Sequence, residues 1–121
     1  MGMHNFRELR IWQRAIDLAV KIYKITGTFS KQEKYGLIVQ LNKCGVSVPS
    51  NISEGARRAT NKQFKYFLEI SMGSCNEIQT QFELSKRFEY VSKETGDEII
   101  DEALQLYKMI LAFYNTLLVK E

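Results

Sequence analysis

The chain has 121 residues, of which 45% are hydrophobic and 26% are charged, values typical of one folded domain spanning residues 1–121. Two cysteines and one histidine exclude the common metal clusters, and no Glu-x-x-His motif of a di-iron bundle is present. The longest apolar run, 109–114, is far shorter than the roughly 20 residues of a membrane span, and no signal-peptide core is present. We therefore expect a cytoplasmic protein without membrane contact or cofactor, with Cys44 and Cys75 as buried, reduced thiols.

Pairs of residues with the spacing of a capping box predict the starts of four helices. In such a box a Ser, Thr, Asp or Asn side chain accepts from a free backbone N–H, and a Glu or Gln three residues later reaches back. The pairs are Asn5/Glu8, Ser30/Glu33, Thr60/Gln63 and Thr95/Glu98. The links between the helices, near 27–30, 58–60 and 92–95, are short, which predicts an all-α, antiparallel up-down-up-down four-helix bundle.

The first predicted helix carries two apolar rows. Steps of three and four residues indicate an inward-facing stripe at Leu9, Trp12, Ile16, Ala19 and Tyr23. A second row is formed by Ile11, Ala15, Leu18 and Ile22.

The second predicted helix, from about residue 33 to 57, contains Pro49. Proline lacks the backbone N–H, and its ring crowds the carbonyl of Gly45 four residues earlier. We therefore predict a kink near Gly45–Pro49, in helix 2. The alternative is two short helices, the second capped by Asn51 together with Glu54.

The third predicted helix has small residues at its centre, from Ser71 to Cys75. Its inward stripe is Phe64, Phe67, Ser71, Ser74, Ile78, Gln81, Ser85 and Phe88. Gly73 costs about 1 kcal/mol relative to alanine inside a helix, so we expect helix 2 to pack closely against it as compensation. On that view, Gly73→Leu overpacks the contact and destabilises the bundle by about 1–3 kcal/mol.

The fourth predicted helix is apolar nearly all round, with 15 apolar residues among the 21 from 99 to 119. Its inward stripe is Ile100, Ala103, Tyr107, Ile110, Tyr114 and Leu117. Either the bundle has a wide single core, or copies of the chain meet through helices 1 and 4. We favour the second interpretation, a homo-oligomer.

Charge is separated along the predicted bundle. Residues 1–73 hold 12 Lys/Arg and 5 Asp/Glu, a net +7, and residues 74–121 hold 5 and 9, a net −4. The antiparallel topology gathers cations at one pole, and the candidate nucleic-acid-binding residues are Arg7, Arg10, Arg14, Arg57, Arg58, Lys62 and Lys65. Cations of this kind bind phosphates by releasing counterions, although a merely solvated face explains the same pattern. Since no base-reading motif is present, recognition of the backbone or the shape is favoured.

The segment Ser-Val-Pro-Ser-Asn-Ile-Ser-Glu-Gly at 47–55, with Tyr35-Gly36-Leu37 before it and Arg58 after it, carries a family resemblance. Further matches are Phe64, Phe67-Leu68, Gly73-Ser74 and Glu77. The chain strongly resembles the bacterial four-helix-bundle proteins encoded in intervening sequences of 23S rRNA genes, the S23 family, over nearly its whole length. The accessory variability determinant of diversity-generating retroelements looks similar.

The resemblance implies a bundle without established catalysis, commonly assembled as a ring-like pentamer. For the retroelement relatives it also implies nucleic-acid binding and a reverse-transcriptase partner. This chain departs from the pattern at Ser53, where alanine is usual, and at Lys43-Cys44, where Arg-Ala is usual. Lysine keeps the charge but loses the guanidinium fork, which puts an arginine-specific role at that position in doubt.

The polar residues of the resembling segment are interpreted as a structural network between helices 2 and 3. The network comprises Asn51, Glu54, Arg58, Ser74 and Glu77. Glu54 and Arg58 are four residues apart and can pair on one helix face. Acid–base catalysis by Glu54 and Glu77 is disfavoured because no nucleophile, metal site or phosphate-binding glycine loop accompanies them.

The leading hypothesis is a noncatalytic, homo-oligomeric bundle that binds nucleic acid, with RNA favoured. The alternative is an oligomeric scaffold for a protein partner, such as a reverse transcriptase, that makes no direct contact with nucleic acid. The basic pole favours the first hypothesis, and the apolar helices are consistent with both.

Overall fold

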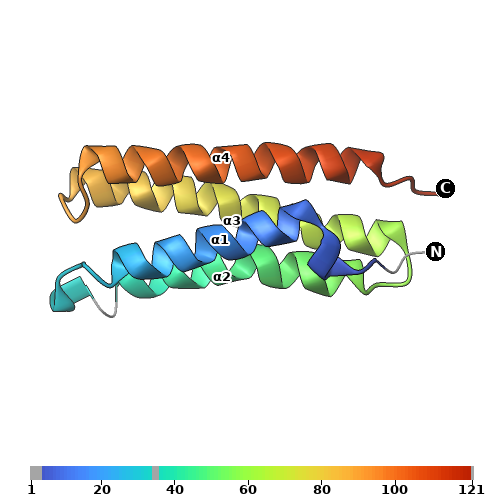
Figure 1. Cartoon of the computed structure of the whole chain (residues 1–121), viewed down its shortest axis with the longest axis horizontal. Coiled ribbons are helices and arrows are strands. Elements are labelled where there is room, and N and C mark those ends of the chain that lie inside the picture. The colour runs from blue at the N-terminus through green and yellow to red at the C-terminus, as the bar shows by residue number, and fades with distance from the viewer. Residues whose placement is uncertain (1–3, 34–35, 121) are drawn as a thin grey trace.

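The computed structural model describes residues 4–33 and 36–120. Its helices are α1 (Arg10–Thr26), α2 (Leu37–Ala56), α3 (Asn61–Arg87) and α4 (Lys93–Thr116), with short 3-10 turns η1 (Phe6–Glu8) and η2 (Lys31–Glu33). Figure 1 shows the four long helices side by side along one axis, with the N- and C-termini at the same end. The predicted all-α, up-down-up-down four-helix bundle is thus confirmed.

Thr60 caps α3 as predicted, accepting from the Gln63 N–H at 3.2 Å. The predicted start at Thr95 is wrong, because Ser92 is the N-cap of α4 and accepts from the Thr95 N–H at 3.0 Å. A serine in extended backbone three residues earlier provides the same cap, so the helix begins at Lys93.

The two other predicted starts precede short turns rather than the long helices. Asn5 accepts from the Arg7 N–H at 3.2 Å and caps η1, and α1 begins only at Arg10. Ser30 accepts from the Gln32 N–H at 3.3 Å within η2, and α2 begins at Leu37 instead of near 33. Lys34 and Tyr35 lie outside the described residues.

The two apolar rows of α1 are exchanged relative to the prediction. Buried on α1 are Ile11, Ala15, Leu18, Ile22 and Thr26. The row that contains Trp12 and Tyr23 lies instead at the side of α1 that borders α2, half-buried or exposed. Both rows have the same period, and both approach α2: a Cβ on Gly45 would lie 3.3 Å from Ile22 Cδ1 in one row and 3.6 Å from Ala19 Cα in the other.

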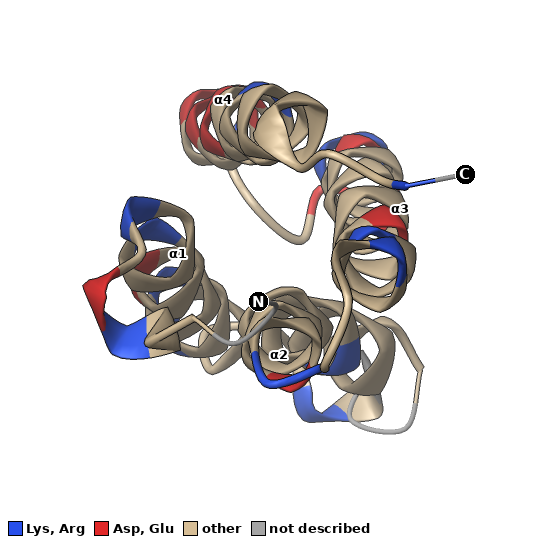
Figure 2. Cartoon of the chain, turned by 90° about the vertical axis from the view of Figure 1, so that its right-hand side faces the viewer, with Lys and Arg blue, Asp and Glu red and all other residues tan. Residues whose placement is uncertain are grey.

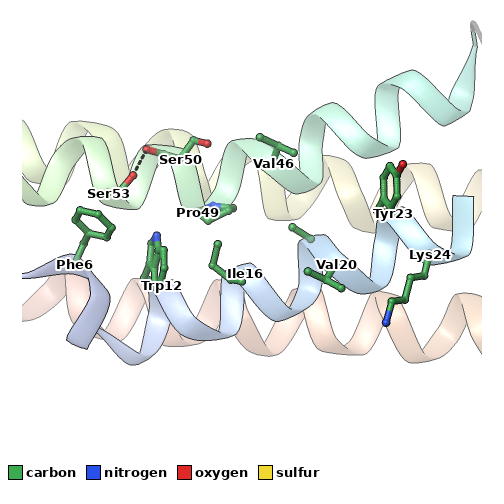
Figure 3. A pocket seen from close by; sticks show the side chains of 11 residues that line it. Phe6, Trp12, Ile16, Val20, Tyr23, Lys24, Val46, Pro49, Ser50 and Ser53 are labelled. Carbon is green, nitrogen blue, oxygen red and sulfur yellow. Dashed lines mark hydrogen bonds between the residues drawn. The ribbon is translucent and has the colours of Figure 1, made fainter.

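The second helix is continuous through Pro49, so the alternative of two short helices is wrong. In Figure 3 its ribbon changes direction beside Val46, within the stretch for which a kink is predicted. The Asn51 side-chain amide donates to the Ser47 carbonyl oxygen at 2.9 Å, close to the turn where proline lacks a donor.

The small residues of α3 do face α2, but Gly73 does not. Ser71 is buried and its hydroxyl donates to the Val48 carbonyl oxygen at 2.9 Å, and a Ser74–Ser47 hydroxyl bond of 2.8 Å lies beside it. Gly73 is exposed, and a Cβ there would meet nothing within 4 Å. The expectation that Gly73→Leu overpacks the bundle is therefore wrong, because position 73 points away from α2. Phe88, also predicted to point inward, is exposed beyond the end of α3.

Candidate nucleic-acid interface at the basic pole

The basic pole is the end of the bundle where α1 and α3 begin and α2 and α4 end, and Figure 2 views it end-on. A hydrogen bond holds the N-terminal segment against the end of α2: the His4 N–H donates to the Ala56 carbonyl oxygen at 2.8 Å. Of the seven predicted phosphate-binding residues, those with exposed side chains are Arg7, Arg10, Arg57 and Lys62. Arg14, Arg58 and Lys65 are half-buried.

Arg7 and Arg57 come from distant parts of the chain and meet over the same aromatic ring. The Arg7 guanidinium carbon lies 5.5 Å from the centre of the Phe6 ring and 5.6 Å from that of Trp12. The Arg57 guanidinium carbon lies 5.9 Å from the Phe6 ring centre. Aromatic faces attract guanidinium groups without using their N–H donors, so both arginines keep donors for a phosphate.

Lys62 lies at a second part of the pole, a surface depression of about 440 Å³ between the start of α3 and the end of the chain. The depression is lined by Ala59, Thr60, Asn61, Lys62, Leu118, Val119 and Lys120. The Asn61 side-chain amide donates to the Leu118 carbonyl oxygen at 2.9 Å and ties the two segments together. The positive end of the α3 dipole lies here, so the depression favours an anion.

The half-buried cations have partners within the chain. Arg58 forms an ion pair with Glu54 and lies over the Phe67 ring, with 4.7 Å to its centre. Lys65 Nζ lies 4.3 Å from the centre of the Tyr114 ring and 3.4 Å from the Leu117 carbonyl oxygen. Both side chains therefore hold elements together at the pole and are less available to a ligand.

Arg14 is turned toward α4. Its guanidinium nitrogens lie 3.4 Å from Gln105 Oε1 and 3.6 Å from Met109 Sδ. Nearby, Lys21 forms a 2.6 Å ion pair with Glu102, which raises the pKa of Lys21. These contacts bridge α1 and α4, so Arg14 belongs to the joint between these helices rather than to the exposed pole.

The predicted polar network falls into separate parts, and its centre is a residue that the sequence did not single out as a site. Ser47 accepts from the Asn51 side-chain amide at 3.0 Å and shares a hydrogen bond with the Ser74 hydroxyl, so Asn51 and Ser74 are joined through it. Glu54 pairs with Arg58 as predicted, but this pair is separate from the serine and asparagine contacts. Glu77 is exposed and forms no hydrogen bond or ion pair with any other described residue.

The thiols are both buried, and burial raises the pKa of Cys75 to about 12 and also raises the pKa of Cys44. High thiol pKa values oppose formation of the nucleophilic thiolate. Within residues 4–33 and 36–120, no three His, Cys, Asp or Glu side chains gather as a metal site would require. Among the same residues, no helix combines the length and the apolar character needed to cross a membrane.

Comparison with known proteins agrees with this fold. A search of the curated proteins gave no match. A crystal structure of a protein of unknown function from the S23 ribosomal protein family of Bacteroides thetaiotaomicron is similar, with a TM-score of 0.77 and 23% identity. The similarity covers 86% of this chain and 97% of that one, and it supports the fold alone. Neither this solved structure nor the family match that follows points to catalysis. Residues 7–112 match the 23S rRNA-intervening sequence proteins, and the chain belongs to that family.

Proposed function

We propose that the chain is a noncatalytic, homo-oligomeric protein whose basic pole binds the phosphate backbone of RNA. The observation that carries this proposal is that Arg7 and Arg57, from distant parts of the chain, both lie within 6 Å of the Phe6 ring centre and are exposed. Arg10 and Lys62 extend the exposed positive surface on either side. Backbone contacts of this kind supply affinity without reading bases.

The opposite pole supports an oriented complex. Its exposed acids include Glu89, Glu94, Glu98 and Asp101. The exposed cations Lys31, Arg87 and Lys93 lie at the same end and offset part of this charge, so RNA is expected to favour the basic pole. RNA is favoured over DNA because the family takes its name from the intervening sequences of 23S rRNA.

Homo-oligomerisation is supported by apolar side chains that face solvent on a single copy. Val46 is 58% exposed and Val20 48%, and both line one groove between α1 and α2, while Tyr66, on α3, is 59% exposed. Light scattering at micromolar concentration is expected to give a multiple of 14.1 kDa. Five copies is the number that the family resemblance favours.

A charge-matched pair of variants tests the RNA interface. The pole variant carries Arg7→Gln, Arg10→Gln, Arg57→Gln and Lys62→Gln. The control variant carries Lys31→Gln, Arg87→Gln, Lys93→Gln and Lys108→Gln, which removes the same charge from exposed sites outside the pole. Each protein is titrated with structured RNA and with duplex DNA at several salt concentrations.

The wild type is expected to bind with an affinity that falls steeply with salt. The pole variant should bind more weakly to unrelated sequences, and the logarithmic salt slope should become shallower by about 3 if four phosphate contacts are lost. The control variant should keep most of the wild-type slope. If the wild type binds neither nucleic acid at low salt, the proposal fails, and the scaffold for a protein partner such as a reverse transcriptase takes its place.

A further inference from the structure

An apolar groove of about 510 Å³ runs between α1 and α2 on the outside of the bundle, here called the α1–α2 groove (Figure 3). Its lining includes Trp12, Ile16, Val20, Val46 and Pro49. Lys24 lies at one end of the groove, and Lys43, one turn from Val46 on α2, is exposed nearby. The groove therefore fits an apolar ridge that carries a negative charge at the Lys24 end.

A surface of that kind lies on the outer side of α3. Tyr66, Ile70, Gly73 and Glu77 follow one another at steps of four, three and four residues and are all exposed; we call them the α3 ridge. Glycine weakens a helix relative to alanine, and no described atom outside its own helical turn lies within 4 Å of a Cβ placed on Gly73. Glu77 likewise lacks a polar partner among the described residues. Close approach of another helix explains the glycine, and a cationic partner explains the glutamate.

The α1–α2 groove and the α3 ridge occupy the same stretch of the bundle axis. The Ser74–Ser47 hydrogen bond sets those residues level, and the contact of Gly45 with Ala19 and Ile22 sets α2 against α1. Copies related by rotation about an axis parallel to the helices keep each residue at its own height. At 1.5 Å per residue, Gly73 is then level with Val48, within about one helical turn of Val46 and Val20.

In the same register, each end of the α3 ridge of one copy lies at the level of a complementary group in the α1–α2 groove of the next copy. Tyr66 reaches the level of Trp12, where Ser50 and Ser53 also line the groove (Figure 3). Glu77 reaches the level of Lys24 and Lys43. Two α1–α2 grooves facing each other antiparallel would instead bring the Lys24 end of one to the Arg57 end of the other, an unfavourable pairing of like charges.

We propose that the α1–α2 groove of one copy receives the α3 ridge of a second copy, with Glu77 between Lys24 and Lys43. This inference rests on the proposed homo-oligomer and names the surfaces that form it. Figure 2 shows α3 on a different side of the bundle from the α1–α2 pair, so the contact is head-to-tail. Such contacts close into rings when the rotation permits, and they leave all basic poles on the same side.

Two variants that each destroy one surface test the pairing. Val46→Glu places a charge in the groove, and Ile70→Glu places one on the ridge; both positions are exposed, so circular dichroism should show unchanged helicity. Each variant alone is expected to have the monomer mass by light scattering. An equimolar mixture should form a dimer, because the intact ridge of the first variant enters the intact groove of the second. Leu104→Glu, at a leucine on α4 with the same 36% exposure as Ile70, is the control and should keep the wild-type mass.

The outcomes separate the inference from the proposed function. If the wild type is itself monomeric, the proposed homo-oligomer fails. If the wild type is oligomeric and either variant keeps its mass, the homo-oligomer stands and the groove–ridge contact is overturned. If both variants are monomeric and their mixture remains so, copies meet through like surfaces, which also overturns the inference.

A charge exchange provides a second test that leaves the apolar surfaces intact. Glu77→Lys sets a cation against Lys24 and Lys43 and should raise the concentration at which the oligomer dissociates. Combining it with Lys24→Glu and Lys43→Glu should restore the wild-type midpoint. A midpoint that is the same in all three proteins would contradict the placement of Glu77.

Discussion

Glycine residues in α2 and α3 meet opposite surroundings. A Cβ on Gly55 would lie 2.8 Å from both Phe64 Cδ1 and Phe67 Cβ, a distance that real side chains do not tolerate. A Cβ on Gly73 would meet open space. The first glycine therefore brings α2 and α3 together, whereas the second only weakens its own helix within a single copy.

Alanine substitutions at these two positions should change stability in opposite directions. Gly55→Ala is expected to lower the free energy of unfolding by about 1–3 kcal/mol, because rings of α3 must move. Gly73→Ala is expected to raise it by about 0.5–1 kcal/mol, because alanine loses less backbone entropy in a helix. Urea unfolding in the Val46→Glu background, expected to be monomeric, removes any effect of assembly. A Gly55→Ala protein as stable as its parent would show that the two helices can separate freely there.

Thiol reactivity should follow burial. With a pKa of about 12, Cys75 is almost entirely protonated at pH 8, and its sulfur is inaccessible. In a Cys44→Ser protein, which leaves only Cys75, a chromogenic disulfide reagent should therefore react slowly until denaturant is added. Rapid labelling of the folded protein would mean that α3 opens locally from the core.

At the scale of the helices, the number and the direction of the elements could be predicted because both depend on local features. The Thr60 cap and the apolar period of α3 are examples. The buried row of α1 could not be predicted in the same way, since two rows share one period and the packing of the other helices into one core decides between them. One residue corresponds to a 100° turn, so Ser74 faces α2 while its neighbour Gly73 faces solvent.

The candidate site could be predicted in part: which cations gather at the pole, but not all of their contacts. The antiparallel topology brings Arg7 and Arg57 to one pole, and that much follows from the order of the helices. The pairing of Arg58 with Glu54 follows from their spacing of four residues. The partners of Arg14 and Lys65 lie on α4 and could not be predicted from spacing along the chain. The link from Ser47 to Ser74 could not be predicted from the spacing within α2, because Ser74 lies on a different helix.

The junction of α3 and α4 predicts a dependence of stability on pH. Lys86 Nζ lies 2.5 Å from Asp97 Oδ1 and 3.1 Å from Glu83 Oε1, and hydrogen bonds from Lys86 lower the pKa of both carboxyls. A carboxyl with a lowered folded-state pKa stabilises the protein above its unfolded-state pKa, and this contribution is lost as the pH falls through the folded value. The wild type should thus exceed Lys86→Gln in unfolding free energy at pH 7, and the difference should shrink below about pH 4. A difference that does not depend on pH would assign the role of Lys86 to packing of its stem against Gly96.

At the scale of the whole molecule, charge separation and head-to-tail assembly act together. The basic pole of one copy offers only a few exposed cations, chiefly Arg7, Arg10, Arg57 and Lys62. Copies that share one orientation set their basic poles side by side on one face, while the opposite ends gather on the other. An RNA long enough to cross several poles then binds each further copy as an intramolecular step.

This arrangement predicts that assembly changes the affinity for long RNA but not for short RNA. The monomer expected from Val46→Glu keeps every residue of the basic pole, so a short oligonucleotide that covers one pole should bind it as it binds the wild type. A structured RNA that spans several poles should bind the wild type more tightly, by about 10²–10⁴-fold if two or more poles engage together. Its salt slope should also be steeper, because more counterions are released. Fluorescence anisotropy with both RNAs measures the comparison at equal protomer concentration. Equal affinities of the two proteins for the long RNA would show that a single pole holds it, even within the oligomer.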